Sequence, residues 1–277
     1  MPDLENRLAE LTFKDYATLQ DRNKIINSTI EEFVTGLPHD QPMTLTGDIR
    51  KAIDSCFAYD NIDSIFKALD SVASQGSGEL KTWAEETKKT ILERSPTSVK
   101  VTLKQMQLGR NWTIDHALQR EYHIAAVFMD GHDFNEGVSA KLIRKPAQKP
   151  QWQPASLNEV TMDEVDRYFA VRGQDQLQLY NRGPGATYLR YPHGWIGLPT
   201  ERDVELVVQE GGKSRADVVK HFVKVKEGKL GVKEKVSEIL DRKTRTEAGA
   251  LAWDSSAELA HDSNITRGSR DPINSGR

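Results

Sequence analysis

Apolar residues recur every three or four positions along most of the chain, which predicts amphipathic helices rather than strands. Near the start of the chain, for example, Ile26, Ile30 and Phe33 lie at helical spacing. The same period predicts helices over residues 46–57, 61–73, 79–93, 96–108, 113–130, 201–210, 214–226 and 230–243, with a short helix from about 132. No segment shows a convincing strand alternation, so the predicted fold class is mainly α.

Polar residues mark the starts of several of these helices. Ser95 is a favourable N-cap directly before Pro96, and proline suits the first helical position. Thr161 and Glu164 have the spacing of a capping box ahead of a short helix that ends near residue 169. Between residues 171 and 199, Gly and Pro interrupt every period, so we expect a loop there.

Composition narrows the class of protein. The 277 residues are 37% hydrophobic with a mean hydropathy of −0.61, which is lean for one compact globule, so we expect part of the chain to be solvated. No apolar run approaches the length of about 18 residues that a membrane span needs, so no membrane partner is predicted. Asp3, Glu5 and Glu10 make the start acidic, unlike a transit or signal segment. The single cysteine, Cys56, cannot form an internal disulfide.

Positive charge is concentrated in residues 211–245. Eleven Lys and Arg stand there against five Asp and Glu, a formal excess of +6 in a chain whose net charge is −3. Two interpretations stay open: a solvated helical pair with a buried apolar seam, or a surface that contacts RNA or another polyanion.

The spacing of histidines and glycines does not support two other kinds of site. His116 and His123 lie seven apart on one predicted helix, about two turns, but no third ligand is spaced to join them, so no metal site is predicted. The glycines at 182–185 and 210–214 lack the spacing of a phosphate-binding loop.

The stretch 132–154, HDFNEGVSAKLIRKPAQKPQWQP, combines features of a well-fixed element. Asp133 and Glu136 favour a helix N-terminus and Lys141 its C-terminal end, while Trp152 stands between two prolines. The basic end could instead cradle a phosphate, and the tryptophan could pack on a neighbouring surface.

Four segments together carry a resemblance to a known family. They are RSPTSVKVTLKQ at 94–105, REYHIAA at 120–126, the long run from DGHDFNEG to SLNEV at 130–160, and DEVDRYF at 163–169. In this order and spacing they resemble the C-terminal region of 3-hydroxyisobutyryl-CoA hydrolases, in the crotonase superfamily. The resemblance covers roughly residues 1–170, and the later helices are similar to an extension of fungal members.

The resemblance implies a mitochondrial enzyme of valine breakdown that hydrolyses an acyl-CoA thioester. In the family, a spiral of ββα turns carries the catalytic groups, and an all-helical region follows it. We therefore expect a helical C-terminal region that lacks the spiral core and carries no catalytic residue. Glu121 and Glu136 match scaffold positions of the family rather than its catalytic carboxylates.

The resemblance also implies partners and candidate residues. The acyl-CoA substrate itself carries coenzyme A, so no separate cofactor is expected, and the spiral core, a homo-oligomer and mitochondrial rRNA are the candidate partners. Arg144 and Lys145 are the nearest candidates for a CoA contact. The residues expected to act in packing or at an interface are Pro96, Phe134, Glu136, Gly137 and Trp152.

Three hypotheses follow for the whole chain. The leading one is a C-terminal fragment or truncated product of a fungal 3-hydroxyisobutyryl-CoA hydrolase, an enzyme by family and inactive alone. The alternative is a structural component of the small subunit of the fungal mitochondrial ribosome that contacts rRNA through residues 211–245. A third is that Met1 is not the true start. The expected organisation is a helical region at 1–170, a linker at 171–199, a basic helical extension at 200–245 and a disordered tail at 246–277.

Overall fold

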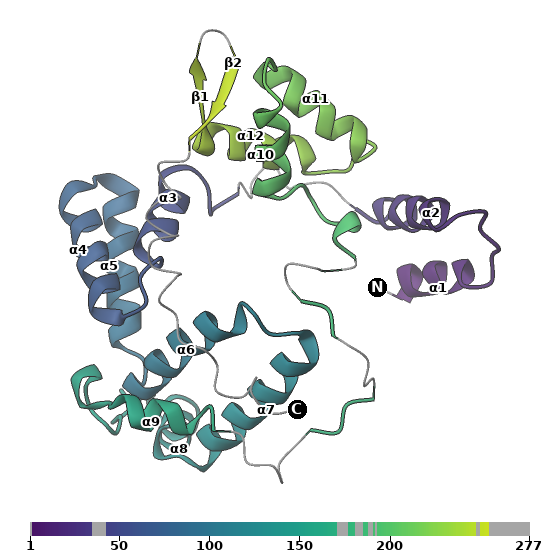
Figure 1. The fold of residues 1–277 in the computed structure, drawn as a ribbon. Coiled ribbons are helices and arrows are strands. Elements are labelled where there is room, and N and C mark those ends of the chain that lie inside the picture. Colours follow the sequence, from purple (N-terminus) through teal and green to yellow (C-terminus); the bar gives the residue numbers. More distant parts are fainter. Residues whose placement is uncertain are drawn as a thin grey trace. The chain divides into compact units, whose positions relative to one another are not determined.

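The described residues fold mainly into helices, as Figure 1 shows. The structure is a computed structural model that describes residues 2–34, 43–170, 177–180, 185–187, 191, 193–247 and 250–254. The mainly α fold class predicted from the sequence is confirmed. Contacts divide the described residues into two compact units, one built from those within 2–51 and 193–254 and the other from those within 52–191.

The second unit contains the middle helices of the chain. They are α4 (Ile62–Gln75), α5 (Gly78–Leu92), α6 (Pro96–Gly109), α7 (Ile114–Asp130), α8 (His132–Val138), the π-helical turn η1 (Ser139–Ile143), the 3-10 turn η2 (Leu157–Glu159) and α9 (Met162–Arg167). Helices α4 and α5 form a hairpin (Figure 1). One core cluster, around Ile65, Leu69 and Ala84, lies in this hairpin, and a second, around Val101, Trp112 and Val165, joins α6 to α9.

Local signals set several of these boundaries. The Ser95 hydroxyl accepts from the Ser98 N–H, and α6 begins at Pro96 as predicted. Thr161 and Glu164 form the predicted capping box of α9, in which each side chain accepts from the other's backbone N–H. The π-helical turn after α8 was not predicted.

The first unit combines helices from the start of the chain with later elements between residues 193 and 254. It contains α1 (Pro2–Leu11), α2 (Leu19–Glu31), η4 (Gly194–Ile196), α10 (Glu201–Gln209), α11 (Arg215–Val225), α12 (Val232–Lys243), β1 (Thr244–Glu247) and β2 (Ala250–Trp253), with α3 (Gly47–Cys56) crossing the boundary between the units. Its core consists of Val204, Val207, Val208, Val218, Phe222, Val232, Val236, Ile239 and Leu240. Because every one of these residues comes from α10 to α12, those three helices form the body of the unit.

The strands β1 and β2 are a finding that the sequence pattern did not predict. They pair antiparallel, with Thr244 opposite Trp253 and Glu247 opposite Ala250. Leu251 and Trp253 pack against the core of α10 to α12, so tertiary packing holds a hairpin whose own pattern is weak. The sequence predicted a disordered tail from residue 246. Residues 246–247 and 250–253 instead belong to this hairpin, and residues 255–277 lie outside the described residues.

The contact units divide the chain differently from the four predicted segments, and the predicted domain boundaries stay a prediction. Within the described ranges, no helix combines the length and apolarity that crossing a membrane requires.

Candidate functional site

The segment 132–154 is held together by one buried carboxylate. Glu136 on α8 is 9% exposed, and its two oxygens accept from Arg144 Nη1 at 3.1 Å and Nη2 at 2.8 Å. The Gln151 N–H donates to the same carboxylate at 2.9 Å. The hydrogen bonds from Arg144, and next the one from Gln151, lower the pKa of Glu136. The π-helical turn brings Glu136 and Arg144 together, and the bidentate pair closes the loop after α8.

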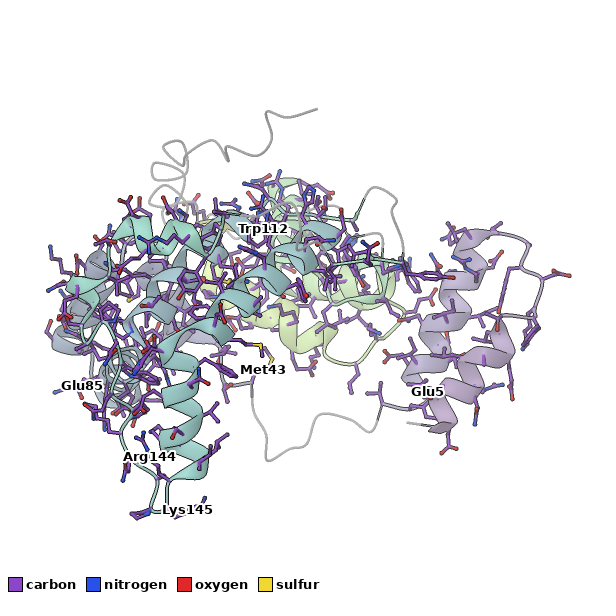
Figure 2. The ribbon with its side chains drawn as sticks, turned by 90° about the horizontal axis from the view of Figure 1, so that it is seen from below. Glu5, Met43, Glu85, Trp112, Arg144 and Lys145 are labelled. Carbon is purple, nitrogen blue, oxygen red and sulfur yellow. The ribbon has the colours of Figure 1, made fainter. Side chains whose placement is uncertain are left out.

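This pairing bears on the residues predicted to contact CoA. The guanidinium of Arg144 is engaged by Glu136. The side chain of Lys145 is exposed, and Figure 2 shows it at the outer end of the loop. The CoA contact of Arg144 and Lys145 stays a prediction.

The other predicted packing residues differ in their surroundings. The Trp152 indole N–H donates to the Glu93 carbonyl at 3.1 Å, and Trp152 packs so closely on Gly137 that a Cβ there would lie 3.3 Å from the ring. Pro96 is buried at the start of α6. Phe134 is 45% exposed, and its role as a packing anchor stays a prediction.

Asp133 ties the loop to α6. Its carboxylate accepts from the Ser95 hydroxyl at 2.5 Å and from the Gln153 N–H at 2.9 Å. Both Asp133 and Glu136 therefore accept hydrogen bonds from donors within the chain. This arrangement is typical of a structural clamp rather than of a proton-transfer site.

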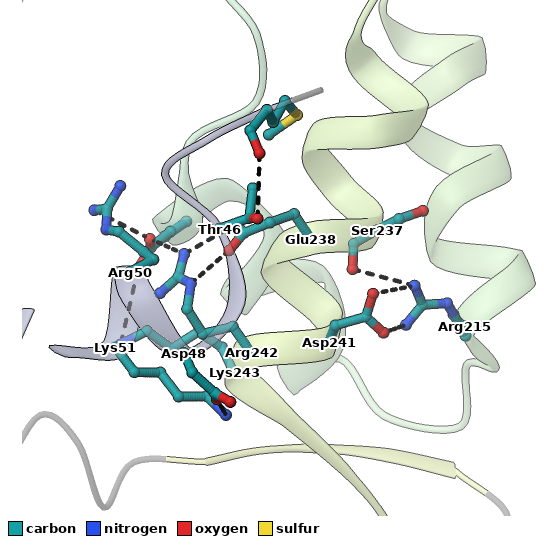
Figure 3. A network of polar contacts seen from close by, with 12 residues as sticks. Thr46, Asp48, Arg50, Lys51, Arg215, Ser237, Glu238, Asp241, Arg242 and Lys243 are labelled. Carbon is teal, nitrogen blue, oxygen red and sulfur yellow. Dashed lines mark hydrogen bonds and ion pairs between the residues drawn. The ribbon is translucent and has the colours of Figure 1, made fainter. Parts of the chain in front are cut away.

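The first unit contains a second polar network, drawn in Figure 3. The Arg242 side chain is 1% exposed, and it pairs with Glu201 at the start of α10 and with Glu238 on α12, where Nε lies 2.8 Å from Oε1. Arg50 Nη2 lies 3.6 Å from the Glu201 carboxylate. Burial raises the pKa of Glu201, but the hydrogen bond and charge of Arg242 outweigh it, so the net shift is downward.

Most of the cations in residues 211–245 are engaged within the chain. Lys213 pairs with Glu210, Arg215 with Asp241, Lys229 with Glu31 and Asn27, Arg242 with Glu201 and Glu238, Lys243 with Glu201 and Arg245 with Glu247, while Lys226 donates to the Trp195 carbonyl. These seven side chains are engaged within the chain, and the buried Arg242 is the one whose pairs contribute most to the unit. Net charge alone therefore overstated the positive surface that a polyanion could meet.

Sequence reasoning missed the long-range partners of these cations. Lys229 Nζ lies 2.5 Å from Glu31 Oε1 and 2.9 Å from Asn27 Oδ1, across 198 and 202 positions of sequence. No local period reports such a pair. The sequence showed only an excess of positive charge in residues 211–245 and an acidic residue, Glu31, at the end of a predicted helix.

Comparison with known proteins gives a family and several relatives. The model of the family described as enoyl-CoA hydratase/isomerase matches residues 1–169. The chain is 45% identical over 87% of its length to the small ribosomal subunit protein mS47 of Neurospora crassa, covering 48% of that protein. It is 32% identical over 66% of its length to mS47 of Schizosaccharomyces pombe, covering 38% of it. The mouse mitochondrial 3-hydroxyisobutyryl-CoA hydrolase is 39% identical over 46% of the chain and 31% of the enzyme.

These matches correct one prediction and confirm another. The prediction that the chain is an enzyme by family, a 3-hydroxyisobutyryl-CoA hydrolase, is wrong, because the relative that matches along most of the chain is named as a ribosomal protein and the mouse hydrolase matches less than half. The mitochondrial localisation is confirmed by the mitochondrial relatives. The chain spans about half the length or less of the curated relatives it matches. With the family model covering residues 1–169 of 277, the chain belongs to the enoyl-CoA hydratase/isomerase family.

Proposed function

We propose that the chain is a structural, non-catalytic component of the small subunit of the mitochondrial ribosome and that residues 211–245 contact its rRNA. One observation carries this proposal. The family model ends at residue 169, whereas the match to the Neurospora crassa ribosomal protein covers 87% of the chain and so must extend well into the later helices. Helices α10 to α12 therefore belong to the part of the chain that is similar to the ribosomal protein but lies outside the family model.

The described contacts fit a structural role. Glu136 and Asp133, the buried or half-buried carboxylates of the clamp in 132–154, are occupied by donors within the chain. The body of the first unit presents cations on α11 and α12, and cations are what an rRNA backbone recruits.

Sedimentation tests the proposal. The full chain, tagged and expressed in mitochondria, is expected to sediment with the small ribosomal subunit in a density gradient and to leave it as salt is raised, because phosphate contacts weaken with ionic strength. A chain that stays at the top of the gradient at low salt would contradict the proposal. So would turnover of 3-hydroxyisobutyryl-CoA by the purified chain, since the proposed role is non-catalytic.

A further inference from the structure

Four lysines of the basic window differ from the seven engaged cations. Lys220, Lys224, Lys233 and Lys235 make no ion pair with any residue that the structure describes, and the first three are exposed. Their charges are not used to hold the fold together. They are therefore the cations of 211–245 that are available to a partner.

Helix geometry places two of these lysines away from the core. On α11, Val218 and Phe222 are buried in the first unit, with 0% and 5% exposure. Lys220 and Lys224 each follow one of these residues by two positions, a rotation of about 200° around the helix. They are one turn apart from each other, so both ammonium groups project from the solvent face of α11.

The other two lysines flank the buried seam of α12. Lys233 follows the buried Val232, and Lys235 precedes the buried Val236, so each is turned about 100° from a core residue. Helices α11 and α12 pack against each other, which makes their lysines part of one helical body.

Few acids offset these lysines. Asp217, one turn before Lys220, accepts from the Ser214 N–H at 3.0 Å and hydroxyl at 2.6 Å as part of the α11 capping box. Glu234 is exposed between Lys233 and Lys235. Cations remain in excess, and point charges on flexible stems suit phosphate oxygens without reading a base sequence.

We propose that Lys220 and Lys224, supported by Lys233 and Lys235, contact the phosphate backbone of RNA, while the seven engaged cations of 211–245 do not. This deepens the proposed function and rests on it. The contact is electrostatic and independent of sequence. An acidic protein surface is the competing partner, and the experiment separates the two.

The test compares two double variants of the full chain. K220Q/K224Q removes two available charges, and K213Q/R245Q removes two charges of the same unit that are paired with Glu210 and Glu247 on the surface. Both change the net charge equally, so any difference between them reports direct contact rather than the overall field. K220R/K224R keeps the charges.

Binding to an RNA duplex is measured by fluorescence anisotropy over a series of salt concentrations. Each phosphate contact contributes about 0.7–0.9 to the slope of log affinity against log salt, so the slope of K220Q/K224Q is expected to be smaller by about 1.4–1.8. The slope of K213Q/R245Q is expected to stay that of the wild type, and so is that of K220R/K224R.

Each alternative result is decisive. Equal slopes for the two neutralising variants would overturn the assignment of Lys220 and Lys224. A K220Q/K224Q variant that binds RNA normally but no longer sediments with the small subunit would overturn RNA in favour of an acidic protein partner. If the wild type sediments with the small subunit but shows no salt-dependent RNA binding, this inference fails while the ribosomal role stands; absence of sedimentation would instead remove the proposed function.

Discussion

Replacing Arg242 by methionine tests whether the buried ion network holds the first unit together. The Arg242 side chain is 1% exposed and pairs with Glu238, which is 10% exposed (Figure 3). It also pairs with Glu201, whose side chain is 30% exposed. Methionine keeps much of the volume and removes the charge. The variant therefore leaves two carboxylates without their shared partner in a partly dry environment.

The expected cost follows from the burial. Removing one partner of a buried pair costs about 3–5 kcal/mol, and the lower end applies because water reaches Glu201. With a urea m-value of about 1–3 kcal/mol/M, a destabilisation of about 3 kcal/mol moves the unfolding midpoint down by about 1–3 M. The change is expected in hydrogen exchange of α10 and α12 peptides, which carry the network.

Two further variants show whether the reasoning is right. R245M makes the same substitution in a pair with both side chains more than half exposed, and it is expected to cost less than about 1 kcal/mol. R242M/E238M also removes Glu238, the more buried of the two carboxylates, whereas Glu201 keeps Arg50 and Lys243 nearby. The double variant is expected to recover part of the stability, because the penalty lies in the unpaired buried charge. A midpoint for R242M that equals that of R245M would refute the assignment of Arg242 as the centre of the network.

Two more outcomes follow from close packing and from titration. G137A is expected to gain less stability than G109A, or to lose some. A Cβ at residue 137 would lie 3.3 Å from the Trp152 ring, whereas a Cβ at residue 109 would meet ordinary contacts at 3.5 Å. A gain of about 0.5–1 kcal/mol in the unfolding free energy of both variants would contradict this prediction. In the folded state, burial raises the pKa of Glu31, but the hydrogen bonds from Lys229 and from the Leu230 N–H, with the charge of Lys229, outweigh it and hold the pKa below its ordinary 4.5. Glu31 therefore contributes stability that is present above pH 4.5 and is lost as pH falls through the lower folded pKa. The difference in unfolding free energy between wild type and E31Q is expected to shrink on acidification. A difference in urea midpoints that stays constant with pH would refute this prediction.

Local sequence signals predicted the helices and some of their ends. The start of α6 at Pro96 and the capping box of Thr161 and Glu164 follow from chemistry within four residues, which a sequence displays directly. The sequence pattern did not predict the hairpin of β1 and β2, because Leu251 and Trp253 are held by packing against the core of α10 to α12. Tertiary packing decided that element, and no local period records it.

In the candidate sites, too, local features were predictable from the sequence and long-range contacts were not. The pair of Glu136 and Arg144 spans eight residues, a spacing that no regular α-helix brings into contact. The two side chains meet because the chain makes a π-helical turn after α8 and then leaves the helix at Arg144. The sequence therefore indicated a well-fixed segment but predicted a CoA contact for Arg144, whose guanidinium is turned to Glu136. In residues 211–245, the charge excess was visible and its internal use was not.

One of these internally used charges, on Lys229, connects α2 to the turn between α11 and α12. Lys229 binds Asn27 and Glu31 of α2, the Leu230 N–H donates to Glu31 at 3.2 Å, and Glu227 lies 3.3 Å from Lys24. Helix α2 belongs to the segment that the enoyl-CoA hydratase/isomerase family model matches, whereas the turn at 227–230 lies beyond it. The later helices are therefore joined to residues that the family model matches, chiefly through the half-buried side chain of Lys229. Because Lys229 is engaged at this junction and six other cations of 211–245 are paired elsewhere in the unit, the lysines that remain for an external polyanion are Lys220, Lys224, Lys233 and Lys235.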